Sequence, residues 1–220
     1  MCGRFSLTQS AWAIAQTFQL SDVPNLTPRY NIAPTQQIGT ILQKAQRQFQ
    51  WMQWGLIPSW AKDPSIGNKL INARAESLRE KPSFRNAFKR RRCLIVADGF
   101  YEWQKIDKRK QPYYIQMHDD KPFAFAGLWD TWQPPEGEAI ASCTIITTSA
   151  NAIVQPIHDR MPVILSPDRY TQWLDPTLTD TQVLQDLLQP YNSDAMKATP
   201  VSSAVNNPAN EKPECIAPPQ

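Results

Sequence analysis

The middle of the chain, from residue 92 to 148, is a succession of short apolar segments separated by turn residues such as Asp98-Gly99. Apolar or alternating runs of this length, bounded by turn residues, are typical of β-strands. The segments expected to be strands are residues 92–97, 100–103, 113–117, 123–128 and 142–148. This series predicts a mostly antiparallel sheet as the centre of the fold.

Helices are predicted on either side of this series. Thr8 is a candidate cap for a helix over residues 9–19, whose apolar side chains recur at the i, i+3, i+4, i+7 spacing of one buried face. Further strands are expected at residues 37–42 and 47–54, a short helix-like segment at 150–154, and two further helices at 168–174 and 180–188. No internal repeat or low-complexity linker is evident, so we expect one α+β domain over residues 1–220, with a curved antiparallel sheet.

The composition excludes several classes of protein. Of the 220 residues, 41% are hydrophobic and 20% are charged, as in globular proteins. No run of 18 apolar residues is present and the first residues lack the apolar core of a secretory signal, so neither a membrane span nor export is expected. The four cysteines show no paired spacing and are expected to be free thiols. With two histidines and no Cys-x-x-Cys, no metal or cofactor is expected.

Charge is distributed unevenly along the chain. Residues 1–110 contain 18 Lys/Arg and 7 Asp/Glu, whereas residues 111–220 contain 5 and 13. Residues 79–92 alone contain seven Lys/Arg and one Glu. A basic half favours an anionic partner, most often nucleic acid, but two oppositely charged halves can also neutralise each other within the fold. The basic segment is either a phosphate-binding surface or an ordinary solvated face.

The chain starts with Met1-Cys2-Gly3-Arg4-Phe5, which suggests a reactive N-terminus. We expect Met1 to be removed because the Cys2 side chain is small, and this leaves an amine and a thiol on adjacent carbons. A free α-amine has a pKa of about 7.7–8.0, so it is far more available as a nucleophile near neutral pH than Lys, at about 10.4. Amines form Schiff bases with aldehydes, and the neighbouring thiol can then close a five-membered thiazolidine ring. The alternative is that Cys2 is merely a small buried residue.

Two further stretches place polar groups where chemistry is possible. Asn72, Arg74 and Glu76 bring an amide, a cation and a carboxylate within five residues. Glu102 lies between aromatic residues in a predicted strand, where burial would raise its pKa. The alternatives are a surface turn for the first stretch and the solvent face of a strand for Glu102.

Several motifs together resemble the SRAP family (SOS response-associated peptidase), whose members are also described as abasic-site processing proteins. The resemblance covers nearly the whole chain, with one departure at Val96, where many members have Pro. Besides residues 1–5, the matching segments are Tyr30-Asn31-Ile32-Ala33-Pro34, Trp54-Gly55-Leu56-Ile57-Pro58, Asn72-Ala73-Arg74-Ala75-Glu76, Ala97-Asp98-Gly99-Phe100-Tyr101-Glu102-Trp103, Ile146-Thr147-Thr148, Ile157-His158-Asp159-Arg160-Met161-Pro162 and residues 201–206.

The resemblance implies a β-barrel-like core with flanking helices and a positively charged groove. It implies covalent capture of abasic sites in single-stranded DNA through the N-terminal cysteine. The residues carried over as catalytic are Cys2, Asn72, Glu102 and His158. In these roles Asn72 orients the amine and the sugar oxygen, Glu102 relays protons for ring opening and imine formation, and His158 does so for imine hydrolysis.

A DNA-binding surface follows from the same resemblance. Its expected members are Arg4, Pro34, Trp54, Trp60, Arg74, Trp103, Thr148 and Arg160. The arginines suit phosphates and the tryptophans suit stacking on, or wedging between, bases at the lesion. We expect a monomer in the cytoplasm, associated with the nucleoid, or in the nucleus of a eukaryote.

Two other classes of function stay open on the sequence alone. An N-terminal-nucleophile hydrolase, such as a glutamine amidotransferase domain, also begins with Cys-Gly and would direct the thiolate at an amide. A non-covalent single-strand binder would leave Cys2 incidental and would show strong salt dependence without a crosslink. The peptidase in the family's name requires no more than removal of Met1.

Overall fold

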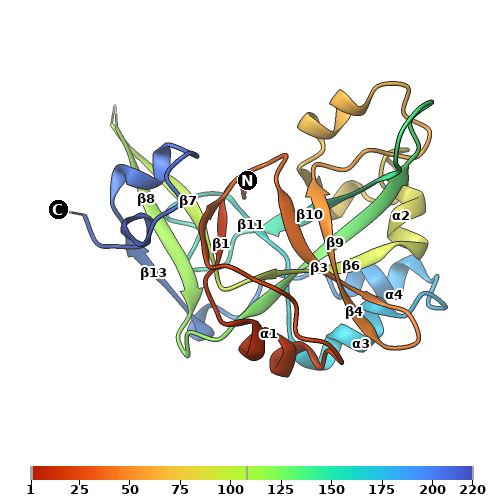
Figure 1. Cartoon of the computed structure of the whole chain (residues 1–220). Coiled ribbons are helices and arrows are strands. Elements are labelled where there is room, and N and C mark those ends of the chain that lie inside the picture. Colours follow the sequence, from red (N-terminus) through yellow and green to blue (C-terminus); the bar gives the residue numbers. More distant parts are fainter. Residues whose placement is uncertain (1, 108, 220) are drawn as a thin grey trace.

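Five strands close into a barrel at the centre of the molecule (Figure 1). The computed structural model describes residues 2–107 and 109–219. Around the barrel, each strand pairs with the next and the last pairs with the first. In this order the strands are β10 (Ile140–Ser149), β4 (Arg47–Trp54), β3 (Gln37–Gln43), β6 (Arg92–Ala97) and β9 (Phe123–Trp132). The predicted α+β class with a barrel-like core is confirmed.

The barrel is closed by a parallel pair, which the sequence pattern did not predict. β10 runs parallel to β4, with Cys143 opposite Trp54, while the other four contacts of the ring are antiparallel. Parallel neighbours need a long connection. Here that connection is residues 55–139, and β10 also runs parallel to the short strand β5 (Asn72–Arg74) within it. Of the antiparallel contacts, β3–β4 and β9–β10 join strands that are consecutive in the chain, whereas β3–β6 and β6–β9 join strands with other elements between them.

A second sheet packs beside the barrel and carries the N-terminus. Its strand order is β13 (Met196–Pro200), β8 (Arg109–Met117), β7 (Gly99–Ile106), β1 (Phe5–Leu7) and β2 (Arg29–Ile32). Aromatic rings join the two sheets: Phe125 of β9 meets Phe5 and Phe100 edge-on, with ring centroids 5.7 and 6.0 Å apart. This shared core fixes β1 against the barrel.

Short helices cover the outside of the sheets. The helices are α1 (Ala11–Phe18), α2 (Arg85–Arg90), α3 (Tyr170–Leu174) and α4 (Thr181–Asp186), and the remaining strands are β11 (Arg160–Pro162) and β12 (Ile164–Leu165). The predicted cap Thr8 is wrong: Ser10 accepts the N–H of Ala13 at the start of α1. Thr8 instead donates its hydroxyl to Asp98. Within residues 2–107 and 109–219, no helix is long and apolar enough to cross a membrane.

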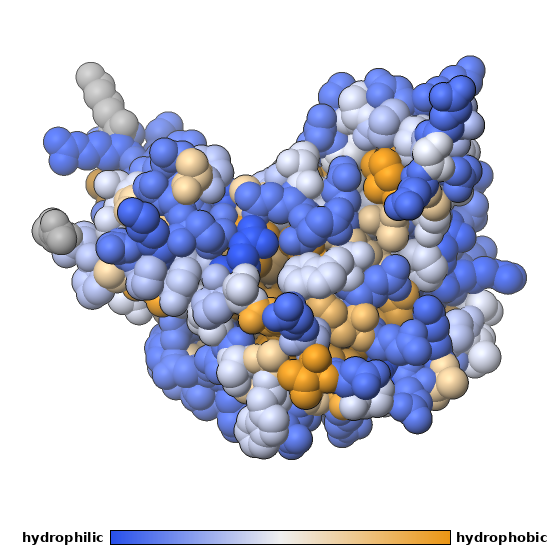
Figure 2. Space-filling model, viewed as in Figure 1, coloured by the Kyte–Doolittle hydropathy of each residue, from blue (hydrophilic) through white to orange (hydrophobic). Residues whose placement is uncertain are grey.

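A hollow opens on the face shown in Figure 2, between the side formed by β7 and β8 and the opposite side of the molecule. Its rim is mostly hydrophilic, with apolar side chains beneath. In the same view, β1 and β11 lie at the middle of the molecule, behind this hollow. These two strands adjoin the predicted catalytic residues Cys2 and His158.

Candidate functional site

Cys2 lies buried just before β1, against the side chain of Asn72. The Asn72 side-chain amide donates a hydrogen bond to the Cys2 carbonyl oxygen at 2.8 Å. The other end of the amide, Oδ1, is buried and has no hydrogen-bond partner among the described residues. The amide nitrogen of Asn72 therefore holds the backbone of Cys2 in place, while its oxygen Oδ1 can still accept a hydrogen bond at the site.

The position of β1 depends on Asp98, at the turn between β6 and β7. The Asp98 carboxylate accepts hydrogen bonds from the hydroxyls of Ser6 and Thr8, at 2.6 and 2.8 Å, and from the backbone N–H groups of Thr8 and Gln9. Ser6 also bonds the hydroxyl of Tyr114, at 2.7 Å. Because Asp98 is itself buried, these charge-assisted bonds anchor the end of the strand that Cys2 precedes.

Glu102 reaches the same site from β7. Phe5 pairs with Phe100, and the N–H of Tyr101 donates to the Arg4 carbonyl at 3.0 Å, so Glu102 follows in register beside the residues next to Cys2. Glu102 is buried, and this burial raises the pKa of its carboxyl. Its electrostatic interactions reach both Cys2 and His158. The carboxyl is thus placed to hold or release a proton at the centre of the cluster.

The Cys2 thiol is held in its protonated form. Burial raises the pKa of the thiol well above its ordinary value, and the neighbouring charge of Glu102 raises it further. The sulfur lies 3.7 Å from the Arg4 carbonyl oxygen, the acceptor that a thiol proton would use. Attack by sulfur therefore requires a base to take the proton, and Glu102 is the titratable group beside it.

His158 completes the cluster from the turn before β11. Gln104 of β7 donates to the Pro156 carbonyl at 3.0 Å, which holds this turn against the strand of Glu102. His158 Nδ1 lies 3.0 Å from the backbone N of Arg160 and 2.9 Å from Asp159 Oδ1. The first contact needs an unprotonated Nδ1 and the second a protonated Nδ1, so the two contacts belong to different proton arrangements of the ring. His158 has a partner in either state.

The three predicted phosphate-binding arginines differ in how far the protein already uses them. Arg74 is exposed on β5. Arg4 is half-buried, with one Nη donating to Asn31 Oδ1 at 2.9 Å and to the Val205 carbonyl at 2.8 Å. Arg160 forms a two-pronged ion pair with Glu76. Arg74 is thus the most accessible of the three to a phosphate.

Arg4 also belongs to a strap that holds the C-terminal segment on β2. Asn31 is buried and its amide nitrogen donates to the carbonyls of Val205, Asn207 and Asn210. Glu211 accepts the backbone N–H of Asn31 at 2.8 Å. Arg4 therefore has a structural role in this strap, and its phosphate contact stays a prediction.

The three predicted stacking tryptophans also differ. Trp54 is 0% exposed, donates its indole N–H to the Ile71 carbonyl at 2.8 Å and packs on Phe5. It is a core residue with no face for a base, which corrects its assignment to the DNA-binding surface. Trp60 is 56% exposed, and Trp103 is half-buried with its indole N–H on Asn206 Oδ1 at 2.7 Å. For these two residues, stacking on bases stays a prediction.

The remaining predicted DNA contacts are less accessible than the sequence suggested. Pro34 is half-buried after β2. Thr148 is buried in β10, where it pairs with Met161 of β11. Neither side chain is exposed. We therefore propose that any contact with DNA at these two positions involves the backbone or the edge of the side chain.

Three of the seven cations in the basic segment at residues 79–92 have partners within the folded protein. Arg92 is buried. Its guanidinium donates hydrogen bonds to five backbone carbonyls, those of Phe88, Lys89, Trp173, Asp175 and Leu178. Arg91 pairs with Asp130 at 3.1 Å, and Arg79 donates to the Thr181 carbonyl at 2.7 Å. The other four cations of the segment, Lys81, Arg85, Lys89 and Arg90, are exposed, as is Arg79. The run is therefore partly structural, and its charge overstates the phosphate-binding capacity.

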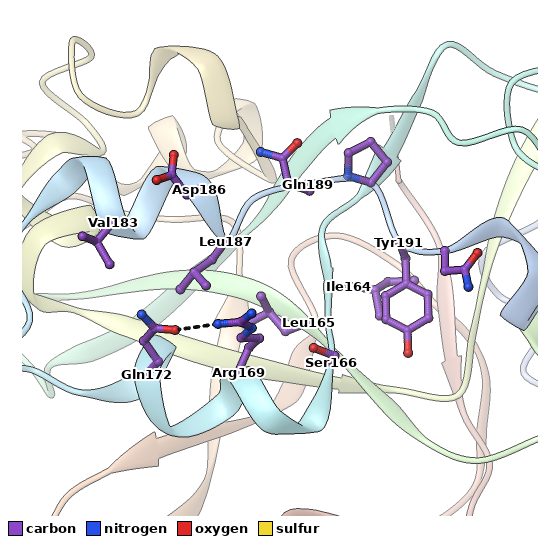
Figure 3. Close-up of a pocket in the computed structure, with 12 residues that line it drawn as sticks. Ile164, Leu165, Ser166, Arg169, Gln172, Val183, Asp186, Leu187, Gln189 and Tyr191 are labelled. Atoms are coloured by element: carbon purple, nitrogen blue, oxygen red, sulfur yellow. Dashed lines mark hydrogen bonds between the residues drawn. The ribbon is translucent and has the colours of Figure 1, made fainter.

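A separate cavity of about 520 Å³ lies between β12 and the helices α3 and α4 (Figure 3). Leu165, Leu187 and Tyr191 give it an apolar wall, and Arg169 donates to Gln172 at 3.4 Å on one side. None of the predicted catalytic or DNA-binding residues lines it. In the described ranges, no cluster of three or more His, Cys, Asp or Glu side chains is arranged to hold a metal.

A family model described as SOS response associated peptidase (SRAP) matches residues 1–208. The chain belongs to the SRAP family. Among its relatives, Abasic site processing protein YoqW of Bacillus subtilis (strain 168) is 49% identical over 221 residues, which cover 98% of this chain and 99% of that protein. Abasic site processing protein HMCES of Xenopus tropicalis is 36% identical over 228 residues, covering 89% of this chain and 68% of that protein.

Solved structures support the same membership. The crystal structure of a protein from Bacteroides thetaiotaomicron superposes with a TM-score of 0.89 at 28% identity and covers all of both chains. One from Bordetella bronchiseptica gives a TM-score of 0.79 at 27% identity, covering 91% of this chain and 100% of that chain. The SRAP fold is therefore shared along most of the length of this chain.

The four residues predicted as catalytic lie close together in the structure, but sequence reasoning did not foresee the contacts that hold them there. Asp98 anchors β1, Asn31 and Glu211 hold the C-terminal strap, and Glu76 holds Arg160. Asp98, Asn31 and Glu76 all lie inside the motifs that carried the resemblance. For Asp98 and Asn31 the available signal was a polar residue among apolar neighbours, which folding buries, whereas Glu76 is exposed and gives no such signal.

Proposed function

We propose that this SRAP protein captures abasic sites in single-stranded DNA covalently, with Cys2 as the reacting residue after removal of Met1. The observation that carries the proposal is the convergence of four residues in one cluster, in which Cys2 and Glu102 are buried and Asn72 and His158 are half-buried. The names of the relatives, abasic site processing proteins, support DNA with abasic sites as the substrate. The protein then shields the lesion by staying attached to it.

In the first step the Cys2 amine attacks the aldehyde carbon of the ring-opened abasic sugar. The carbon–nitrogen bond forms, the aldehyde oxygen leaves as water after taking up two protons, and an imine results. Glu102 is suited to deliver a proton, because burial keeps its carboxyl protonated to higher pH than an ordinary Glu. Asn72 Oδ1, a buried acceptor, is suited to orient the amine N–H or a sugar hydroxyl.

In the second step the Cys2 sulfur attacks the imine carbon. The thiol proton passes to Glu102 and the imine nitrogen takes up a proton, so that a neutral five-membered thiazolidine closes without loss of atoms. Because sulfur and imine belong to one residue, the closure is intramolecular and gains the effective concentration of a positioned partner. His158, whose Nδ1 has both a backbone N–H and a carboxylate oxygen within hydrogen-bond distance, is suited to move protons in imine hydrolysis and release.

Strand binding precedes this chemistry. Exposed Arg74 and the partly buried Arg4 and Arg160 are the proposed phosphate contacts, and such contacts position the strand without reading its sequence. Exposed Trp60 and half-buried Trp103 are proposed to stack on bases beside the lesion. A missing base leaves a gap that a side chain can fill without unstacking a neighbour.

The test is a denaturing gel of the protein mixed with single-stranded DNA that contains one abasic site. We expect a slow-migrating covalent species, absent with an undamaged strand of the same sequence. Salt-dependent binding without this species would support a non-covalent binder instead. Release of ammonia from glutamine would support the N-terminal-nucleophile hydrolase.

A further inference from the structure

Glu76 and Arg160 form a planar, two-pronged ion pair next to the site. Arg160 Nη1 lies 2.7 Å from Glu76 Oε1 and Nη2 lies 3.0 Å from Oε2. Nη2 also donates to the Thr147 carbonyl at 2.6 Å. The Arg160 side chain is 14% exposed, so the pair is less screened than a surface ion pair, although Glu76 itself is 57% exposed. Such a fork fixes a guanidinium in one orientation.

This ion pair spans one strand and joins its two neighbours. Thr147 of β10 pairs with Arg74 of β5 on one side and with Pro162 of β11 on the other. Glu76 lies in the 3₁₀ turn that follows β5, and Arg160 begins β11. β5 carries Asn72, and His158 stands two residues before Arg160. The pair therefore ties the element of Asn72 to the element of His158 across β10.

The same arginine sets the state of the imidazole through its backbone. Its N–H donates to His158 Nδ1 at 3.0 Å, which favours the neutral ring with the proton on Nε2. Asp159, whose carboxylate lies 2.9 Å from Nδ1, favours a proton on Nδ1 instead, but its side chain is 86% exposed and the attraction is screened. Glu102, on β7, also interacts electrostatically with His158. The Arg160 N–H and the Asp159 carboxylate therefore favour opposite proton positions on the ring.

We propose that Glu76 is a positioning residue for His158: by clamping Arg160, it keeps the Arg160 N–H on Nδ1 and so presents Nε2–H to the reaction. Glu76 touches no reacting group itself and acts through Arg160. The effect of Glu76 on the reaction rests on the proposed function. Its effect on which nitrogen of His158 carries the proton does not.

The first test therefore uses the DNA-free protein. Nitrogen-15 NMR of the imidazoles distinguishes the two neutral tautomers, and the chain has only two histidines, so His118→Gln assigns the signals. We expect the wild type to show His158 as the Nε2–H tautomer and Glu76→Gln to show a mixture of tautomers. Glu80→Gln, which removes a nearby exposed carboxylate, is the matched control and should leave the signals unchanged.

Glu76→Asp separates positioning from a loss of folding. It keeps the carboxylate on a shorter side chain and should restore most of the wild-type tautomer. An unchanged Nε2–H tautomer in a folded Glu76→Gln protein overturns the proposal. So does an equal effect of Glu80→Gln.

The second test measures the reaction by single-turnover crosslinking and release. Glu76→Gln should slow the His158-dependent step by about tenfold, less than the roughly 10²–10⁴ of a complete acid–base loss. In a His158→Gln background the same substitution should have no further effect, because Glu76 acts through that residue. Effects that multiply independently would contradict the proposal.

A different role for Glu76 has its own signature. If the carboxylate stands in for a DNA phosphate on Arg160, Glu76→Gln would raise the salt slope of strand binding by about 0.7 and leave the imidazole unchanged, which overturns positioning. If the wild type forms no adduct, the proposed function fails while the tautomer experiment still decides the role of Glu76.

Discussion

The side-chain amide of Asn72 donates a 2.8 Å hydrogen bond to the carbonyl oxygen of Cys2. The two residues are 70 positions apart, and β5 and β1 belong to different sheets, so this bond links the second sheet to the barrel at the residue that we propose reacts. We predict that Asn72→Ala slows adduct formation by about 2- to 10-fold, the value of one hydrogen bond of about 0.5–1.5 kcal/mol, with a further loss if Oδ1 orients substrate. Single-turnover crosslinking measures this, and a wild-type rate would remove Asn72 from the site.

Cys2→Ser should retain the amine and lose the stable adduct. A serine hydroxyl is a far weaker nucleophile than a thiolate, so the imine would form but would not be trapped as a stable ring. The expected product is an imine that borohydride reduction traps and that heating releases without reduction. A heat-stable adduct from Cys2→Ser, equal in amount to that of wild type, would contradict the thiazolidine step.

Glu102→Gln should change stability in a pH-dependent way. Burial raises the pKa of Glu102 in the folded protein, so the folded state binds its proton more tightly than the unfolded state does. Its contribution to stability is then fully present below the unfolded pKa and is lost as pH rises through the folded pKa. Relative to Glu102→Gln, the wild type should therefore lose stability across that window in denaturant titrations. Parallel pH profiles for the two proteins would mean that the carboxyl is not titrating as a buried group.

The same substitution tests the proposed proton transfer. Glu102→Gln keeps the shape of the side chain and removes the titrating group, so capture should slow by about 10²–10⁴. His158→Gln should change release more than strand binding. Capture and release measured across pH 5–9 check both, and unchanged rates with Glu102→Gln would leave this residue a structural one.

Asp98→Asn should weaken both the fold and the reaction. The carboxylate accepts bonds from Ser6, Thr8 and Gln9, and an amide can replace only some of them. Losing one bond to a buried charged group costs about 1.5–3 kcal/mol. We expect a lower midpoint in urea and slower capture, because the end of β1 is no longer anchored. A stable variant with normal capture would show that the aromatic core alone positions Cys2.

Arg74→Ala should act on strand binding alone. Arg74 is exposed, so its loss should weaken non-covalent binding and lower the salt slope by about 0.7, with the chemical step unchanged at saturating DNA. Binding titrations at several salt concentrations, with Lys89→Ala on α2 as a matched exposed cation, test this. A normal slope with a lost reaction would place Arg74 in the chemistry instead.

Much of the fold was predictable because it depends on local patterns. Alternation and turn residues predicted the strands that form the barrel, and the helical spacing at residues 9–19 predicted α1. The division into two sheets was not predicted: β7 and β8 of the central series lie in the second sheet, and β3 and β4 from outside the series complete the barrel. The parallel closure was not predictable, because Cys143 meets Trp54 only after the intervening residues have folded. Local sequence patterns predict individual helices and strands. The pairing of two strands that are far apart in the sequence depends on how the whole core packs.

The candidate site shows the same division. Cys2 and Glu102 attracted attention through their own chemistry, one as an aminothiol and the other as a carboxyl among aromatic residues. Trp54 was predicted to lie on the DNA-binding surface because the sequence does not distinguish a buried tryptophan from an exposed one. In the structure it is buried. Glu76 was noted in its motif, but its partner Arg160 lies 84 residues away, and only the pairing of β5 and β11 with β10 brings them together.

The most direct test of the central claim is the intact mass of the adduct formed with a single-stranded oligonucleotide that carries one abasic site. The account predicts the mass of the chain without Met1 plus that of the oligonucleotide minus one water, with peptide mapping that places the link at Cys2. The thiazolidine should persist without a reducing agent. No adduct, or an adduct on a lysine of a chain that retains Met1, would contradict it.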